Sequence, residues 1–385
     1  MQYTFQPGRL KPESQESNAR DFSLHRQFSL ENAFYITDEL AVDDRLFVEG
    51  GVRLPLFVSL GPSNVNIYRK NFPLETGNVV DTLHFKVVQP VKAYVGLEPR
   101  LSARWMADPN ASFKLGYNRM YQFLHLVTNT TAVTPVDIWQ PSGYYFKPQR
   151  ADQVSLGYFR DFKEKAFGAS TEVYYKHIKN ILDFKDGAQL ILNNHLETEL
   201  LQGIGRTYGV ETSLFKNKGR LTGTLNYTYS RSFRQIKGPT SSESINNGKQ
   251  YPASYDQPHI VNLSWKFNIS RRHYFTGNFT YHTGRPVTIP LSVFTSEQTT
   301  VAYFSTRNQY RIPDYHRLDL ALVIEGNHKR KKWAEGTWVL SVYNAYARKN
   351  PYTVFFNTST AGVPKPYQLS IIGTIFPSLS FNLKF

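Results

Sequence analysis

The stretch YQLSIIGTIFPSLSFNLKF (residues 367–385) decides the fold, because its side chains alternate in character along its whole length. Every second residue from Tyr367 to Phe385 is apolar, counting one glycine and one proline, and those between are mostly polar. Successive side chains of a strand point to opposite faces, so the pattern predicts one strand with an apolar and a polar face. The phase holds through Pro377, which predicts a kink or bulge rather than a turn. Ordinary strands have about 5–6 residues, so this one is unusually long.

The composition favours a membrane β-barrel. The chain of 385 residues has 41% hydrophobic, 15% aromatic and only 19% charged residues. Many aromatic residues and few charges are typical of barrels with aromatic girdles. No run approaches the roughly 18 apolar residues of a membrane helix. The absence of cysteine excludes disulfides, thiol nucleophiles and cysteine metal sites.

The same alternation recurs along the chain. It is clear in RLTGTLNYTYS (220–230), VNLSWKFNIS (261–270) and YFTGNFTYH (274–282). The polar faces carry mostly Thr, Ser, Asn and Gly, which suits a crowded, wet lumen, whereas a soluble sandwich would present Lys and Glu to water. We therefore expect the apolar faces to contact lipid. Four side chains predicted to face outward are Leu225, Tyr227, Trp265 and Phe279.

Short and long spacers alternate between the predicted strands, as do the periplasmic turns and external loops of outer-membrane barrels. The sequence shows no internal repeat and no domain linker. We predict one partial transmembrane antiparallel β-barrel domain over 1–385, with 1–21 a remnant of an extracellular loop and 22–385 forming strands and loops in a meander. The thirteen predicted strands are 22–38, 44–57, 92–106, 112–120, 151–160, 167–179, 205–215, 220–231, 257–270, 271–283, 314–325, 336–346 and 367–385.

An odd strand count has a consequence for closure. Single-chain bacterial barrels have an even number of antiparallel strands, and an unpaired strand edge is costly in lipid. With thirteen strands the first and last would run parallel. We therefore expect either one undetected strand or part of a larger barrel, with an open or gapped wall between 22–38 and 367–385.

Several stretches in order resemble the C-terminal barrel of TonB-dependent outer-membrane receptors of the kind common in Bacteroidota. The resemblance runs from about residue 30 to 385. It implies a cell-surface receptor that binds a scarce nutrient, such as a siderophore, glycan or cobalamin, and imports it across the outer membrane using TonB energy. It also implies that Phe385 is the signal read by the barrel-assembly machinery. The stretches are LEPRLSARW (97–105), GRTYGVETSLFKNKGRLTGTLNYTYSRS (205–232), YPASYDQPHIVNLSWKFN (251–268), RIPDYHRLDLAL (311–322) and LSVYNAYARKNPY (340–352).

The sequence departs from the family pattern at its N-terminal end. Family members carry a signal peptide, a plug that TonB pulls and a barrel of about 22 strands. The opening MQYTFQPGRL lacks the apolar core of a secretory signal. We expect a fragment, a truncated gene or a split assembly that does not transport alone and meets TonB only through the plug. Outer-membrane lipid is an expected partner, and a surface lipoprotein is compatible with this family.

Candidate ligand-binding residues come from two aromatic loops and from lumen charges. The loops are VDIWQPSGYYF (136–146) and VAYFSTRNQY (301–310). Aromatic rings with a few polar groups suit a glycan or siderophore, although loop aromatics also pack on one another. Lumen charges pair with each other or with the plug more often than with a ligand. The candidates are Trp139, Tyr144, Tyr145, Tyr303, Phe304, Arg317 and Asp319.

The other residue clusters of the sequence do not indicate catalysis. The ten histidines are scattered and form no HExxH motif, so we predict no metal and no cofactor. YDQPH (255–259) holds an Asp and a His without a nucleophile-elbow serine. GNHKRKK (326–332) is predicted to be a solvated periplasmic turn, and the net charge of +15 accompanies no nucleic-acid-binding motif. We predict that the chain is not an enzyme and binds no nucleic acid. The alternative is a barrel scaffold for an adhesin or surface hydrolase, which would require repetitive loops or a convergent catalytic group.

Overall fold

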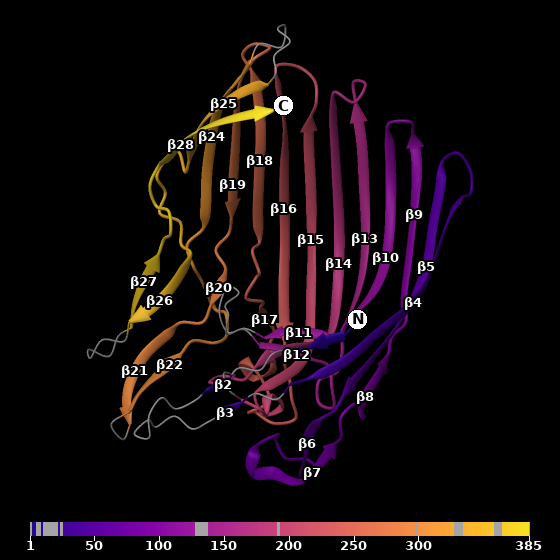
Figure 1. Ribbon diagram of the computed structural model, residues 1–385, viewed down its shortest axis with the longest axis vertical. Coiled ribbons are helices and arrows are strands. Elements are labelled where there is room, and N and C mark those ends of the chain that lie inside the picture. Colours follow the sequence, from indigo (N-terminus) through magenta and orange to yellow (C-terminus); the bar gives the residue numbers. More distant parts are fainter. Residues whose placement is uncertain are drawn as a thin grey trace.

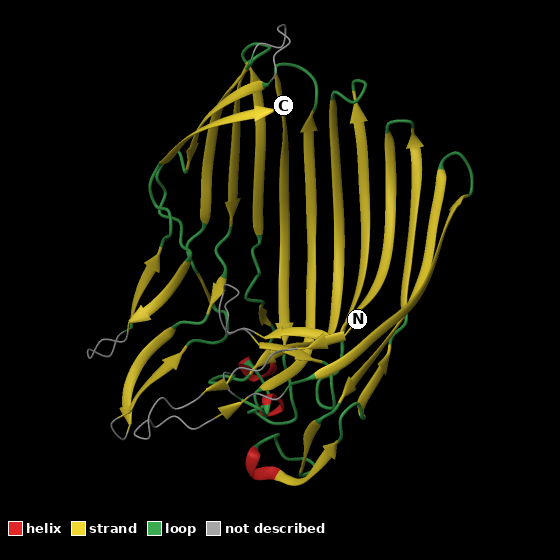
Figure 2. Cartoon of the chain, in the orientation of Figure 1, coloured by secondary structure: helices red, strands yellow, loops and turns green. Residues whose placement is uncertain are grey.

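The computed structural model shows an almost entirely antiparallel β architecture (Figures 1 and 2). It describes residues 2–4, 9–10, 22–23, 26–127, 138–190, 193–296, 299–326, 334–357 and 364–384. Within these ranges no helix has the length and apolar character needed to cross a membrane. One large curved sheet forms a wall, with short turns at one end and long loops at the other (Figure 1).

The wall is a meander in which strands follow one another in sequence order. Every pair of neighbours along it is antiparallel, as alternating short turns and long loops require. Its members, in spatial order, are β1 (Gln2–Thr4), β4 (Phe28–Ala41), β5 (Leu46–Leu60), β9 (Glu98–Asp108), β10 (Ala111–Gln122), β13 (Gln149–Phe162), β14 (Phe167–Phe184), β15 (Leu200–Lys216), β16 (Leu221–Gln235), β18 (His259–Asn268), β19 (His273–His282), β24 (Tyr315–Glu325), β25 (Glu335–Tyr343) and β28 (Phe376–Lys384).

Smaller elements occupy the loop end. Two short strands extend the wall: β8 (Pro90–Val95) pairs with β5, and β17 (Tyr251–Pro252) pairs with β16. The loop hairpins are β2 (Arg9–Leu10) with β3 (Phe22–Ser23), β6 (Ser63–Tyr68) with β7 (Val79–Phe85), β11 (Leu124–Val127) with β12 (Ile138–Pro141), β20 (Pro286–Val287) with β23 (Tyr310–Arg311), β21 (Pro290–Ser296) with β22 (Thr299–Phe304), and β26 (Thr353–Asn357) with β27 (Lys365–Leu369). Three single-turn 3-10 helices are η1 (Thr76–Asn78), η2 (Leu196–Thr198) and η3 (Asn246–Gly248).

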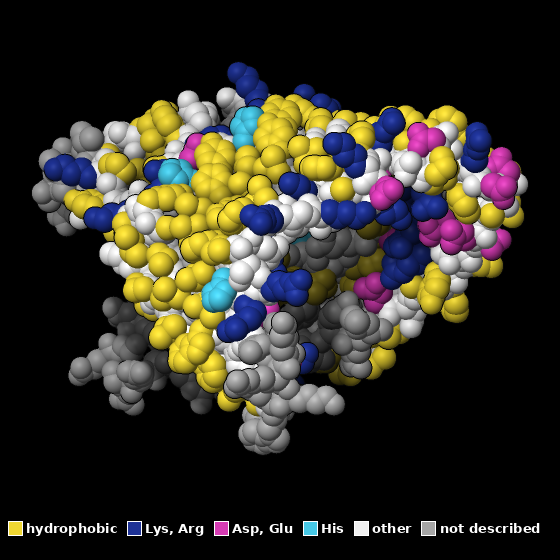
Figure 3. Space-filling model, turned by 90° about the horizontal axis from the view of Figure 1, so that it is seen from above, with side chains coloured by type: hydrophobic (Ala, Val, Ile, Leu, Met, Phe, Trp, Pro, Cys, Tyr) yellow, Lys and Arg dark blue, Asp and Glu magenta, His cyan; other side chains and the backbone are white. Residues whose placement is uncertain are grey.

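The two faces of the wall differ as the alternation predicts. Leu225, Leu263 and Phe279 stand directly opposite one another across β16, β18 and β19, and form part of an apolar outer face. On the other face Ser264 donates a hydrogen bond to Asn278 at 2.8 Å. Figure 3 shows hydrophobic side chains across the outside of the curve and a hollow on its inner side. A shallow apolar depression on the outer face is lined by Leu221, Leu263, Trp265, Phe267 and Phe275.

Each of the thirteen predicted strands corresponds to a wall strand, with boundary differences at both ends of the chain. The predicted first strand, 22–38, is observed as Phe28–Ala41. Gln2–Thr4 pairs with the start of that strand and adds a short strand to the meander. The predicted strand 92–106 is β8 and β9, which keep one register on β5 across a break at residues 96–97.

The prediction of one strand over 367–385 is wrong. Lys365–Leu369 pairs with β26 as a loop hairpin, and the wall strand begins only at Phe376. Between them the buried Asn344 side chain donates to the backbone carbonyls of Ile372 and Thr374, at 3.5 and 3.3 Å. These contacts replace ladder hydrogen bonds, so the alternation there does not reflect a strand. Pro377 lies inside β28, opposite Val342 of β25, and the ladder shows no register shift there.

The wall has two ends. Among the described residues β28 pairs only with β25, and β4 pairs with β5 and with the three residues of β1. Both β4 and β28 run from the loop end to the short-turn end (Figure 1), so they are parallel to each other. No described ladder joins them, which agrees with the predicted open wall.

Candidate functional site

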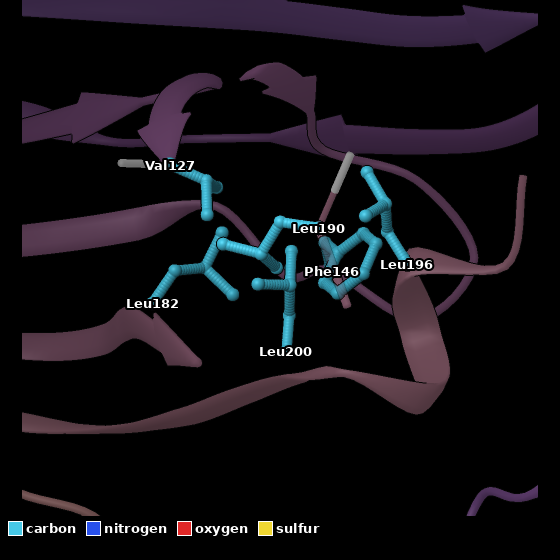
Figure 4. Close-up of a cluster of buried hydrophobic side chains, with 6 residues drawn as sticks. All are labelled: Val127, Phe146, Leu182, Leu190, Leu196 and Leu200. Carbon is cyan, nitrogen blue, oxygen red and sulfur yellow. The ribbon is translucent and has the colours of Figure 1, made fainter. Parts of the chain in front are cut away.

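Several long loops pack against one another at the loop end of the wall, around a small hydrophobic core. The core joins β11, the segment before β13, the end of β14 and the segment leading to β15. Six buried side chains converge there (Figure 4). Burying aliphatic and aromatic groups removes apolar surface from water, which fixes loops that would otherwise be mobile. The six are Val127, Phe146, Leu182, Leu190, Leu196 and Leu200.

A β-bulge directs the end of β14 into the same assembly. The β14–β15 register shifts between Lys179 and Ile181, and Asn180 between them has φ 57°. Asparagine tolerates this left-handed conformation better than most residues. The extra residue places Ile181 on the same side as Ile178, and both are buried in a second core cluster with Tyr251. The bulge thereby also reverses the face to which the following residues point.

Asp183, two residues beyond Ile181, forms the centre of a buried ionic network. Its carboxylate accepts hydrogen bonds from Arg234 Nη1 at 3.1 Å, Arg307 Nη1 at 3.1 Å and the Tyr251 hydroxyl at 2.8 Å. Arg307 Nη2 also donates to Asp186 at 2.6 Å. Only 7% of Asp183 and 8% of Arg307 are exposed. Pairing of this kind stabilises buried charges, and here it links β14, β16 and the loop before β23.

A second buried carboxylate explains the YDQPH stretch. Asp256 is 1% exposed and accepts a hydrogen bond from the Ser232 backbone N–H at 2.6 Å. It also pairs with Arg311, whose Nη1 donates to the Gly284 carbonyl at 2.9 Å. His259 of the same stretch instead contacts the Tyr227 hydroxyl at 3.0 Å. The Asp and the His therefore have separate partners, and Asp256 anchors the start of β18.

Three predicted ligand-binding residues lie on the segment around β12, which we call the aromatic loop surface: Trp139, Tyr144 and Tyr145. Trp139 is 45% and Tyr144 41% exposed, so both present rings to solvent. Tyr145 is half-buried, with its ring edge-on to Tyr144 at 5.0 Å and to Tyr68 at 5.7 Å. Its hydroxyl donates to the Asn66 carbonyl, and burial raises the pKa of Tyr145 to about 12. Tyr145 thus supports a surface that Trp139 and Tyr144 expose.

The buried histidine of β11 is uncharged at neutral pH. His125 on β11 is 4% exposed, and its Nε2 lies 3.2 Å from Ser142 Oγ. Burial away from water disfavours the imidazolium and lowers the pKa of His125 to about 4. The β11–β12 hairpin therefore packs around a neutral imidazole.

The other predicted binding residues lie elsewhere. Tyr303 and Phe304 are 61% and 54% exposed on β22, and Figure 1 shows the β21–β22 hairpin extending away from β11 and β12. Arg317 and Asp319 project from β24 and pair with each other at 2.9 Å. Arg317 also donates to the Tyr343 hydroxyl at 2.7 Å. Among the seven residues, the structure brings Tyr144 into contact with Tyr145 and Arg317 into contact with Asp319, and it places Trp139 on the neighbouring strand β12. Ligand binding at all seven residues stays a prediction.

Two further predictions fall outside the described residues, namely the assembly signal at Phe385 and the basic turn, of which only Gly326 is described. The ranges that the structure does describe hold no cluster of His, Cys, Asp and Glu suited to a metal ion. Sequence reasoning missed the Asp183 network altogether. Asp183 and Arg307 are 124 positions apart, so no spacing motif connects them.

A family model described as TonB dependent receptor-like, beta-barrel matches residues 3–345. This chain belongs to that family. The predicted family, the antiparallel barrel fold and the outer-membrane location are confirmed, since the matched family is that of the TonB-dependent receptor β-barrel. The Bacteroidota origin stays a prediction. No curated protein matches the chain.

Solved structures share the fold at low sequence identity. The ferric yersiniabactin uptake receptor FyuA of Yersinia pestis is 14% identical, with a TM-score of 0.57, over 94% of this chain and 46% of that one. The ferric preacinetobactin receptor BauA of Acinetobacter baumannii is 13% identical, with a TM-score of 0.55, over 97% and 45%. The FrpB iron transporter of Neisseria meningitidis is 12% identical, with a TM-score of 0.54, over 94% and 46%. The chain spans about half the length of these neighbours.

Proposed function

We propose that this chain supplies the wall and the ligand-binding loops of a TonB-dependent receptor that captures a scarce nutrient at the cell surface and imports it. The observation that carries the proposal is the aromatic loop surface. Its two solvent-facing rings lie on loops that a hydrophobic core and a buried ionic network hold in place. A rigid site with preformed aromatic contacts loses little conformational entropy on binding. Family membership supports nutrient uptake rather than catalysis as the task of the wall.

The nutrient class proposed for testing first is a ferric siderophore. The neighbours named above are receptors of ferric yersiniabactin and ferric preacinetobactin and an iron transporter. Flat rings such as Trp139 and Tyr144 stack on the aromatic or heterocyclic groups that many metal-chelating ligands carry. A glycan or cobalamin would use the same rings, and these remain the alternatives that an uptake experiment separates.

The proposed partners follow from this function. TonB would deliver energy through a plug, and the barrel-assembly machinery would insert the strands. A surface lipoprotein would cover the loop end if the nutrient is a glycan. Each of these is a proposal about the receptor as the cell assembles it.

Uptake by whole cells tests the function. In the native host under iron limitation, Trp139→Ala with Tyr144→Ala should reduce TonB-dependent uptake of a labelled ferric siderophore about tenfold or more, since each stacking contact contributes roughly 1 kcal/mol. Trp105→Ala is the matched control, because Trp105 is equally exposed but lies on the outer face of β9. Normal uptake in the loop variant, or uptake independent of TonB, would contradict the proposal. Loss of labelled glycan uptake instead would reassign the nutrient.

A further inference from the structure

The outer face of the wall changes character near the loop end of β10, β13, β14, β15 and β16. Directly opposite residues form rows across these five strands. One row is Leu115, Leu156, Val173, Val210 and Tyr229; the next toward the loops is Tyr117, Val154, Tyr175, Tyr208 and Arg231. Then come Arg119, Asp152, His177, Arg206 and Phe233, and finally Tyr121, Arg150, Lys179, Ile204 and Gln235.

These rows lie on the face that contacts lipid. They alternate by two residues along each strand, so Arg119 shares its face with Leu115, and Lys179 shares its face with Val173. Moving toward the loops, the face is apolar, then rich in tyrosine, then basic. Tyrosine concentrates where a membrane meets water. The basic rows therefore begin where the hydrocarbon core ends.

Four cations form what we call the outward basic band: Arg119, Arg150, Lys179 and Arg206. One carboxylate, Asp152, stands among them, with Arg119 Nε at 2.6 Å and Arg150 Nε at 3.3 Å. Despite this ion pair, Arg150 Nε is buried without a hydrogen-bond partner in the described part of the chain. Lys179 and Arg206 are exposed. A single carboxylate cannot neutralise four cations, so the band carries a surplus of positive charge.

We propose that the outward basic band binds the phosphate groups of anionic lipids in the outer leaflet. Guanidinium groups bind phosphate oxygens in a bidentate fork, which the exposed Arg206 presents, and Lys179 adds a second exposed cation beside it. Long Lys and Arg side chains keep their stems on apolar surface while their charged ends reach the headgroups. Because the apolar rows already contact acyl chains, a lipid with a phosphorylated headgroup satisfies both parts of the face at once. A soluble acidic partner would satisfy only the basic rows.

Lipid binding by the receptor, purified from outer membranes in its assembled form, tests the proposal. The probe is a mixed detergent micelle containing a bis-phosphorylated lipid, with the dephosphorylated lipid as its counterpart. The triple variant Arg150→Gln, Lys179→Gln, Arg206→Gln should bind the phosphorylated lipid on the order of a hundredfold more weakly, and both proteins should bind the dephosphorylated lipid weakly and equally. Should the triple variant not fold, Lys179→Gln alone should weaken binding about fivefold.

A matched variant distinguishes the band from net charge. Arg100, Lys114 and Lys176 lie on the inner face of β9, β10 and β14, where they are opposite Asn118, Gly157 and Gln153 respectively. Their replacement by Gln removes the same charge and should leave lipid binding within about twofold. Equal weakening in both triple variants, or unchanged binding in the outward one, would overturn the proposal. The proposal would also be overturned if an acidic polypeptide displaced the bound lipid and the dephosphorylated lipid bound as well as the phosphorylated one.

Discussion

At the scale of single residues, the loop assembly depends on Asp183. Its carboxylate satisfies two arginines and one tyrosine at the junction of three chain segments. Desolvation raises the pKa of the Tyr251 hydroxyl, and the neighbouring negative charge of Asp183 raises it further. Tyr251 therefore stays a neutral donor, and Asp183 is the anion that Arg234 and Arg307 share. Removing its charge leaves the buried Arg234 without the carboxylate that it pairs with, while Arg307 keeps its bond to the exposed Asp186.

We predict that Asp183→Asn opens the loop assembly. An unpaired buried charge destabilises a protein by about 3–5 kcal/mol, so hydrogen exchange over residues 181–190 and 305–311 should accelerate strongly. The matched control is Asp186→Asn, because Asp186 also pairs with Arg307 but its side chain is 72% exposed. That variant should change local stability by about 1 kcal/mol at most. Equal hydrogen-exchange protection in the two variants would show that the Asp183 network does not stabilise the loop assembly.

At the scale of elements, the sequence predicted strands well and loop contacts poorly. Alternation located the wall strands, because one face of each strand meets lipid and the other meets water, and side chains on successive residues point to opposite faces. The predicted bounds were wrong at 367–385, where the Asn344 side chain donates hydrogen bonds to the backbone carbonyls of Ile372 and Thr374. The aromatic loop surface was predicted from composition. The Asp183 network was not, because long-range pairing leaves no local spacing for sequence reasoning to detect.

The β11–β12 hairpin should lose stability in mild acid. The pKa of His125 is about 4 in the fold and 6.5 when unfolded. Between these values the unfolded hairpin binds more protons, so its stability is complete above pH 6.5 and falls as the pH drops toward 4, by about 3 kcal/mol in all. Hydrogen exchange of residues 124–127 at pH 7.5 and 5, corrected for intrinsic rates, measures this. His125→Gln cannot titrate and should remove the pH dependence; a dependence that persists in it would contradict the assignment.

At the scale of the whole molecule, the wall has two edges, β4 and β28, that run in the same direction. Unpaired backbone groups in lipid cost several kcal/mol each, whereas a domain is stable by only about 5–15 kcal/mol. Within the membrane these edges therefore need antiparallel partners. Two parallel strands cannot supply them to each other in a barrel of this type. We therefore propose that further strands complete the receptor wall to which this chain contributes.

Disulfide cross-linking in intact outer membranes tests this central claim most directly, because the chain has no cysteine of its own. A pair at Ser341 and Ser378, which face each other across β25 and β28, should cross-link readily. Pairs joining the edges, such as Ile36 with Leu379 or Asp38 with Phe381, should not cross-link within one chain. We predict efficient cross-linking of Ser341 with Ser378 and no cross-linking of β4 with β28 within one chain. Efficient cross-linking of β4 to β28 within one chain would show a barrel closed on itself and would contradict it.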